Sequence, residues 1–333
     1  MTIQEFIEYR ISNPQTYELN EDELKCLKVC GAKELLLRRL TSSKFRKTSL
    51  DDSAKQQIKS AIDICINNGS PIKLTYPFGG YKSWRTVGFP NADMAELMTL
   101  SYVIRYAKYL SVVYSPGVIV QFTSDDVIIE KIDNYRKDDL DAYSSSFLSL
   151  IELFKDNLPS NVKVEYRRVV PDLYNVDEYS VDLEAAVESY KLNADPEAEH
   201  DYSGFEFNFL MNGSQDYTGY TEEQMESVYK ELTPYSVAYL SIPKRRAFNR
   251  GEDKIVIFSQ KITNAIDIGS TSSSKAKFWA GTGVLEIDGD RIVDRIVSPK
   301  QFELIRQQLK TETLIIGGVD LAVHTYQGRL NFK

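Results

Sequence analysis

The alternation of elements between residues 70 and 170 is the feature that most constrains the fold of this chain. A short β-forming run, PIKLTY, is followed by a loop, a helical pattern over residues 93–114 and a second apolar run, VIVQFT. Another helical pattern, YSSSFLSLIELF, then leads to a third run, VKVEYR. Strands that alternate with helices are typical of right-handed βαβ units. The sequence therefore predicts an α/β fold with a Rossmann-like, largely parallel sheet.

The segments on either side predict the domain organisation. Residues 1–69 carry three helical patterns, which we expect to form an N-terminal helical cap on an α/β catalytic domain of residues 70–333. Antiparallel hairpins are expected in the C-terminal half, one from VAYLSI and KIVIFS and one from GVLEIDGDRIVDRIVS, before a last helix and strand. The acidic, tyrosine-rich stretch 171–219 is interpreted as a lid or as a surface insertion.

Composition excludes several classes of function. The chain has 333 residues, of which 42% are hydrophobic and 26% charged, so it can bury a large core. A formal net charge of −8 argues against a nucleic-acid binder, which would carry a basic footprint. No apolar run approaches the roughly 20 residues that span a bilayer. Because the N-terminus also lacks a signal-peptide pattern, we expect a cytoplasmic protein that contacts no membrane.

Cofactor and metal motifs are equally scarce. The chain has two histidines and three cysteines without a Cys-x-x-Cys pair, so a histidine-rich metal site is not expected and the thiols are interpreted as free. Phosphate-loop, dinucleotide-binding and Gly-x-Ser-x-Gly patterns are missing. A magnesium ion on Asp125 and Asp126 is one interpretation of that acidic turn, and helix capping is the other. The prediction is chemistry without a cofactor or a metal.

The loop after the first strand carries the most reactive groups. Gly79 and Gly80 allow close approach of the backbone to a ligand, and the next five residues supply two cations, a hydroxyl and two aromatic rings. They are Tyr81, Lys82, Ser83, Trp84 and Arg85. The turn 124–126 follows the second strand, where open α/β sheets gather ligand-binding groups. Loop and turn are predicted to face one pocket for an anionic, partly planar molecule.

These segments resemble the isocyanide (isonitrile) synthase family, which includes pyoverdine-cluster and dityrosine spore-wall biosynthesis proteins. The family pattern has proline and phenylalanine before Lys-Ser, a glycine, a Pro-Asp-x-Ala-Glu helix start, and Pro-Gly before a strand that ends in Ser-Asp-Gly. The similar positions here are Pro77, Phe78, Lys82, Ser83, Gly88, Pro90, Asp93, Ala95, Glu96, Pro116, Gly117, Ser124 and Asp125. Two later segments, 239–243 and AKFWAGTGVLEIDG, resemble the family's Arg-Leu-Ser-Ile-His strand and its Thr-Pro-Trp-His segment.

The departures from the family pattern fall on its polar positions. Asp126 stands for the last glycine, Tyr239 for the arginine and Pro243 for the histidine, and no histidine follows Trp279. The resemblance covers roughly residues 70–290. Because one fold can serve many functions, it implies the fold more firmly than the reaction.

The resemblance implies a biosynthetic enzyme of secondary metabolism, a transferase or lyase that needs no cofactor. It would condense the amine of an amino acid with the ketone of ribulose 5-phosphate, whose carbonyl carbon becomes the isonitrile carbon. Lys82 and Asp125 are the catalytic candidates. The substrate-binding candidates are Tyr81, Ser83, Trp84, Arg85, Ser124, Ser241, Lys244 and Arg245. The expected partners are an amino acid, aromatic if it stacks on Tyr81 or Trp84, a phosphosugar and a second copy of the chain.

Other interpretations remain open from the residues alone. Lys82 is also explained as an ion-paired lysine, Asp125 as a turn cap and Trp84 as a packing residue. The alternative function is a non-catalytic or redirected descendant that binds a small molecule on the same scaffold. A protein-interaction module built on the stretch 171–219 is a third hypothesis.

Overall fold

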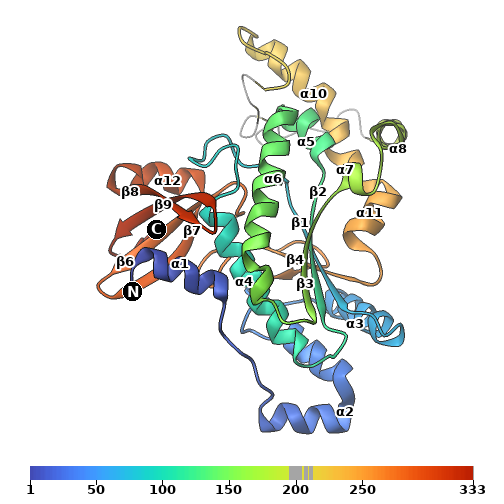
Figure 1. Cartoon of the computed structure of the whole chain (residues 1–333). Helices are drawn as coiled ribbons and strands as arrows, with labels where there is room; N and C mark the ends of the chain where they lie inside the picture. Colours follow the sequence, from blue (N-terminus) through green and yellow to red (C-terminus); the bar gives the residue numbers. More distant parts are fainter. Residues whose placement is uncertain (195–204, 206–208, 210–212, 333) are drawn as a thin grey trace.

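The computed structural model describes residues 1–194, 205, 209 and 213–332. A five-stranded sheet with the order β3-β2-β1-β4-β5 forms its centre, and every pairing in it is parallel (Figure 1). The strands are β1 (Ile72–Pro77), β2 (Val118–Ser124), β3 (Val162–Arg168), β4 (Lys254–Phe258) and β5 (Ile266–Asp267). The predicted α/β class with a parallel core is confirmed.

Helices cover both faces of this sheet. On one face pack α4 (Met94–Ser111), which joins β1 to β2, and α6 (Lys137–Phe154), which precedes β3. On the other face α3 (Asp52–Asn67) and α11 (Pro243–Arg250) contact β1 and β4. The chain thus runs from β1 outward to β2 and β3, and β4 returns to the opposite side of β1. Such a reversal of strand order leaves a crevice at the carboxyl ends of the strands.

The three N-terminal helices are present as predicted: α1 (Ile3–Ser12), α2 (Glu21–Leu40), whose helical dihedrals are interrupted at Gly31, and α3, which Asp51 caps. Arg39, in the last turn of α2, is buried and forms an ion pair with Glu23, while its guanidinium lies 4.2 Å from the centre of the Tyr109 ring on α4. Cation and ring together hold α2 against the sheet-covering helix. The division into a cap and a catalytic domain stays a prediction.

The C-terminal half builds a second, mixed sheet with the order β7-β6-β9-β8. Its elements are β6 (Thr282–Asp288), β7 (Arg291–Val297), α12 (Pro299–Ile305), β8 (Lys310–Ile316) and β9 (Val319–Gln327), with a 3₁₀ turn at Arg306–Gln308. The β6–β7 hairpin is confirmed and turns at Gly289, whose φ is +60°. β6 packs against α4, so this sheet lies beside the central one (Figure 1).

The predicted hairpin between VAYLSI and KIVIFS is wrong. Residues 237–242 instead end α10 (Glu222–Ala238) and form a 3₁₀ turn at Tyr239–Ser241, after which α11 begins at Pro243. A proline lacks the N–H that the first position of a helix leaves unpaired, so it starts a helix readily. KIVIFS is a strand, β4, but it pairs in parallel with β1. The segment with Lys244, Arg245, Arg246 and Arg250 is therefore a helix, α11, that packs against the sheet.

The stretch 171–219 is described only in part. It contains the end of the short helix α7 (Val169–Asp172) and the longer helix α8 (Val176–Asn193). Two further elements lie earlier in the chain: α5 (Asp126–Asp133) and a 3₁₀ turn at Lys155–Asn157. Residues 195–204, 206–208 and 210–212 lie outside the described residues, so its role as lid or insertion stays a prediction. None of the described helices is long and apolar enough to cross a lipid bilayer.

Gly283 generates a test of how the two sheets are joined. A Cβ added there would lie 2.7 Å from the Ala95 nitrogen and 2.8 Å from the Met94 Cβ, at the start of α4. We expect Gly283→Ala to lower the free energy of unfolding by about 1–3 kcal/mol, because backbone atoms cannot yield as a flexible side chain does. Urea denaturation measures it.

Gly289→Asn is the matched control. A Cβ at Gly289 meets nothing within 4 Å, and asparagine accepts the positive φ of that turn. Equal stability of the two variants would contradict the close packing of β6 on α4.

Candidate functional site

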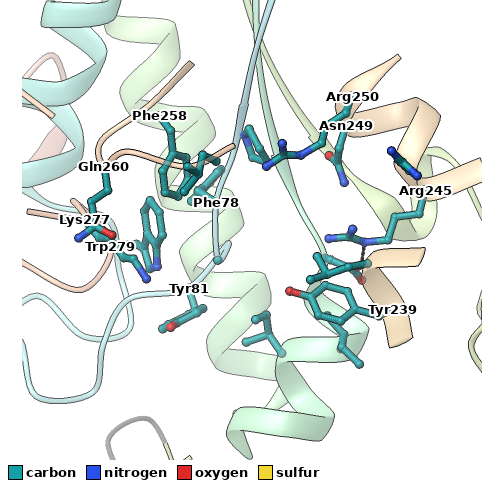
Figure 2. A pocket seen from close by; sticks show the side chains of 18 residues that line it. Phe78, Tyr81, Tyr239, Arg245, Asn249, Arg250, Phe258, Gln260, Lys277 and Trp279 are labelled. Atoms are coloured by element: carbon teal, nitrogen blue, oxygen red, sulfur yellow. Dashed lines mark hydrogen bonds and ion pairs between the residues drawn. The ribbon is translucent and has the colours of Figure 1, made fainter. Parts of the chain in front are cut away.

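A cavity of about 640 Å³ lies where β1, β2 and β4 end, at the point where the strand order reverses (Figure 2). Pro77 ends β1, Asp125 directly follows β2 and Phe258 ends β4, and all three line the cavity. The loop residues Gly79 and Tyr81 line it too. The loop and the acidic turn therefore meet at one site, in a volume that is typical of small-molecule pockets.

Aromatic rings form much of the wall. Trp279 stands at the centre of this group, with its ring centroid 5.7 Å from that of Phe78 and 5.8 Å from that of Phe258. Gly79 permits this packing, because a Cβ there would lie 2.3 Å from the Tyr81 ring and 2.9 Å from the Trp279 Nε1. The Ser83 N–H also donates to the Trp279 carbonyl at 2.8 Å. The segment around Trp279 is thus tied to the loop after β1.

Asp125 is the carboxylate of the cavity lining. It is 5% exposed, and its Oδ2 accepts hydrogen bonds from the Tyr179 hydroxyl at 2.8 Å and from the Arg245 Nε. Its Oδ1 is buried and has no hydrogen-bond partner within the described part of the chain. Asp125 makes no side-chain capping bond on α5, so capping does not account for it. A buried acceptor without a partner is costly unless a ligand donates to it.

Cations outnumber this carboxylate. Arg245, Arg246 and Arg250 come from α11 and Lys277 from the segment before Trp279. Burial alone would lower the pKa of Arg245, but Asp125 outweighs it and raises that pKa, and the guanidinium also lies 4.3 Å from the centre of the Tyr239 ring. Arg245 is therefore fixed by its neighbours. Figure 2 shows Arg245 and Tyr239 on one side of the cavity and Lys277 and Trp279 on the other.

Arg246 and Arg250 remain free for a ligand. Neither forms an ion pair with a carboxylate among the described residues, and Arg250 donates one hydrogen bond, to the Thr263 carbonyl at 3.1 Å. Burial, and next the charges of Arg245 and Arg246, lower the pKa of Arg250. Both side chains also line a neighbouring polar groove between α3 and α11, where Ser241 lies. An anion bound between them would relieve their mutual repulsion.

Lys82 lies outside the cavity lining. Its ammonium is buried and donates to Asp93 at 3.0 Å, to Glu96 at 2.8 and 3.1 Å, and to the Phe278 carbonyl at 3.3 Å. Burial alone would lower the pKa of Lys82, but the carboxylates of Asp93 and Glu96 outweigh it and the net shift is upward. The ammonium therefore stays charged inside a closed ion cluster. Lys82 therefore holds the start of α4 and the Phe278 segment in position and does not contact the cavity.

The structure brings together only some of the residues predicted for the site. Tyr81, Asp125 and Arg245 line the cavity, and Ser241 lines the adjoining groove. Ser124 is bound at 2.8 Å to both Asp126 and the Tyr166 hydroxyl, within a buried network. The other candidates do not line the cavity. Lys82 and Ser83 are buried within the loop, and Trp84 is 37% exposed with the Arg85 guanidinium over its ring. The Lys244 ammonium lies over the Tyr174 ring.

Sequence reasoning did not select three residues of the lining as binding candidates: Tyr239, Lys277 and Trp279. Arg246 and Arg250 belong to the segment expected as a cationic hairpin turn and candidate phosphate clamp, which is a helix in the structure. For the two arginines a signal existed, because a spacing of four residues after Pro243 places them on one face of a helix. The segment 277–279 offered none beyond its resemblance to the family motif. No group of three or more metal-ligating side chains lies together among the described residues.

Comparisons with known proteins bear on the fold. No protein-family model matches the chain, and no curated protein matches it. Among solved structures, the PvcA protein from Pseudomonas aeruginosa matches with a TM-score of 0.52 and 14% sequence identity. The match covers 88% of this chain and 99% of that one. The two chains thus share a fold across most of their length.

The ion cluster of Lys82 generates a prediction on stability. In Lys82→Met the carboxylates of Asp93 and Glu96 would remain buried without their cation, a change that typically costs about 3–5 kcal/mol. We expect a loss of that size in the free energy of unfolding by urea denaturation.

Lys55→Met is the control, because Lys55 pairs with Asp52 at 2.9 Å at the protein surface, where both side chains are exposed. Exposed pairs contribute only about 0–1 kcal/mol. A Lys82→Met protein with unchanged stability and lost turnover would instead support the catalytic role predicted from the sequence.

Proposed function

We propose that this chain is a small-molecule biosynthetic enzyme of the isonitrile-synthase type. Its substrates are an amino acid and a phosphosugar, ribulose 5-phosphate, and the first step joins the amine to the ketone as an imine with release of water. The observation that carries the proposal is the cavity at the strand ends, which combines one carboxylate, free cations and an aromatic wall. The sequence motifs that resemble the family and the fold shared with PvcA support the same scaffold.

The amino acid fits the side of the cavity near Asp125. Its ammonium would donate to the unpartnered Oδ1 of Asp125, and its carboxylate would find Arg245 beside that oxygen. An aromatic side chain would pack against Tyr81 and Trp279. When the amine must lose a proton to attack the ketone, the same carboxylate oxygen is placed to accept it.

The phosphate fits Arg246 and Arg250. A guanidinium presents parallel N–H donors that match phosphate oxygens, and these two lack carboxylate partners among the described residues. Both lie on one face of α11 at the border between the cavity and the groove. With the phosphate held there, the carbonyl end of the sugar extends into the cavity, toward the bound amine.

The second candidate is a redirected descendant that binds such ligands without forming an isonitrile. It is favoured by the departures from the family pattern, because Tyr239 lines the cavity where the family has an arginine, and Pro243 begins α11 where the family has a histidine. Ligand-induced stabilisation of the protein without formation of a product would support this second candidate.

The direct test is mass spectrometry of the protein incubated with ribulose 5-phosphate and a panel of amino acids. Conversion of an amine to an isonitrile adds one carbon and removes two hydrogens, so we expect one amino acid to yield a product with that mass change. Thermal-shift measurements with each ligand run in parallel. Stabilisation by the ligands without any product would overturn the isonitrile reaction and leave the binding function.

The phosphate site gives a second prediction. Arg246→Gln or Arg250→Gln should weaken binding of ribulose 5-phosphate roughly 10- to 100-fold, since a hydrogen bond to a charged group contributes about 1.5–3 kcal/mol. Isothermal calorimetry measures this. Lys244→Gln is the control, because Lys244 is a cation of the same helix that lies over the Tyr174 ring, outside the cavity. Equal losses in all three variants would indicate a general charge effect and contradict the site.

A further inference from the structure

Lys277 is a cavity residue that the proposed substrate contacts leave unused. It is the lysine of the cavity lining, on the wall that carries Trp279 and Gln260 (Figure 2). Its ammonium lies 5.8 Å from the centre of the Trp279 ring, and within the described residues it forms no ion pair and no hydrogen bond. Lys277 is solvent-exposed, but it lies in the cavity lining with no partner for its amine, and there a lysine can act as a nucleophile.

Other lysines with a lowered pKa differ from Lys277 in their contacts and are less exposed. Burial lowers the pKa of Lys47, Lys108 and Lys254, and each donates a hydrogen bond to a backbone carbonyl, those of Ser272, Asn13 and Phe248. Burial also lowers the pKa of Lys277, and the charge of Asp133 acts in the opposite direction. The pKa of Lys277 is therefore lowered, and no carbonyl of the described residues accepts a hydrogen bond from its nitrogen. Its position in the lining makes the amine accessible to a ligand.

We propose that Lys277 is a catalytic nucleophile that forms an imine with the ketone of the phosphosugar. The identity of that ketone rests on the proposed function. The amine nitrogen attacks the carbonyl carbon to give a carbinolamine, which loses water and leaves a C=N bond between the lysine and the sugar. Electrons and atoms balance without an oxidant or a reductant, because one water leaves for each imine formed.

The imine prepares the second substrate's reaction. A protonated imine is a better electrophile than a ketone, so the amine of the amino acid adds to the same carbon and expels Lys277 as a free amine. The product of this exchange is the imine of the amino acid, and the lysine is regenerated. The arrangement in the cavity suits the exchange, since Arg245, which donates a hydrogen bond to Asp125, lies across the cavity from Lys277 (Figure 2).

Trapping by reduction tests the proposal. The protein is incubated with ribulose 5-phosphate and sodium cyanoborohydride, digested, and mapped by mass spectrometry. We expect the peptide that contains Lys277 to gain the mass of the ketose minus water plus two hydrogens. Lys275 is the internal control, because this second exposed lysine lies two residues away, is not part of the cavity lining, and has its ammonium 3.7 Å from the Asp267 carboxylate. Modification of Lys275 and Lys277 to the same extent, or of neither, would overturn the proposal.

Two variants separate nucleophilic from electrostatic action. Lys277→Arg keeps the positive charge but cannot form an imine, and Lys277→Met keeps only the apolar stem. We expect both to lose trapping and turnover, with melting temperatures close to that of the wild type, because Lys277 makes no hydrogen bond or ion pair within the described chain. Turnover retained in Lys277→Arg and lost in Lys277→Met would identify Lys277 as an anion-binding cation and overturn the proposal.

The outcomes distinguish this inference from the proposed function. Isonitrile formation by Lys277→Arg at the wild-type rate would refute the lysine imine and leave the proposed function intact. A trapped imine on Lys277 with no isonitrile from any amino acid would refute the isonitrile reaction and leave the lysine imine intact. It would establish a carbonyl-activating lysine in a protein that runs another amine–ketone condensation.

Discussion

The buried cluster of Lys82, Asp93 and Glu96 is the interaction on which the cavity depends. Asp93 caps α4 and Glu96 closes the reciprocal capping bond, so the two carboxylates that order the start of α4 also bind the ammonium. The same ammonium donates to the Phe278 carbonyl. One cation thus joins the loop after β1, the helix that follows it and the segment that carries Lys277 and Trp279. Burial raises the pKa of Glu96 to about 8 despite the charge of Lys82, so burying these groups is costly, and their mutual contacts offset that cost only in this one arrangement.

Fixed geometry at this cluster explains how distant segments build one wall. The loop stays close to Trp279 because Gly79 has no side chain, and Gly80 adopts a φ of +72° where a Cβ would lie 2.2 Å from the Ser124 Cβ. The chain therefore presses the loop between the strand end of β2 and the Trp279 segment. Lys82 of the loop is buried in its ion cluster, and the cavity lining receives its positive charge from α11 and Lys277 instead.

The fold was more predictable from the sequence than the site. Apolar strands, capping residues and the loop between them indicate β1, α4 and β2 through local physics, and the structure confirms them. The prediction for residues 237–242 was wrong because their aromatic and branched side chains suit a strand. In the structure α10 ends at Ala238, a 3₁₀ turn follows at Tyr239–Ser241, and Pro243 begins a new helix. The position of Lys277 depends on which strand lies beside β1. That is a long-range pairing, and local pattern does not encode it.

The distribution of histidine limits the proton chemistry that the cavity can use. His324 lies on β9 with its Nδ1 bound to the Thr311 hydroxyl at 2.8 Å, in the mixed sheet, and His200 lies outside the described residues. His324 is not among the cavity-lining residues. In the proposed reaction, the groups of the described lining that can transfer protons are Asp125, Tyr239 and Lys277. Burial raises the pKa of Tyr239, so its phenol holds its proton at neutral pH. In the proposed imine exchange, the Asp125 carboxylate and the Lys277 amine, whose pKa burial lowers, would serve as the acid–base pair.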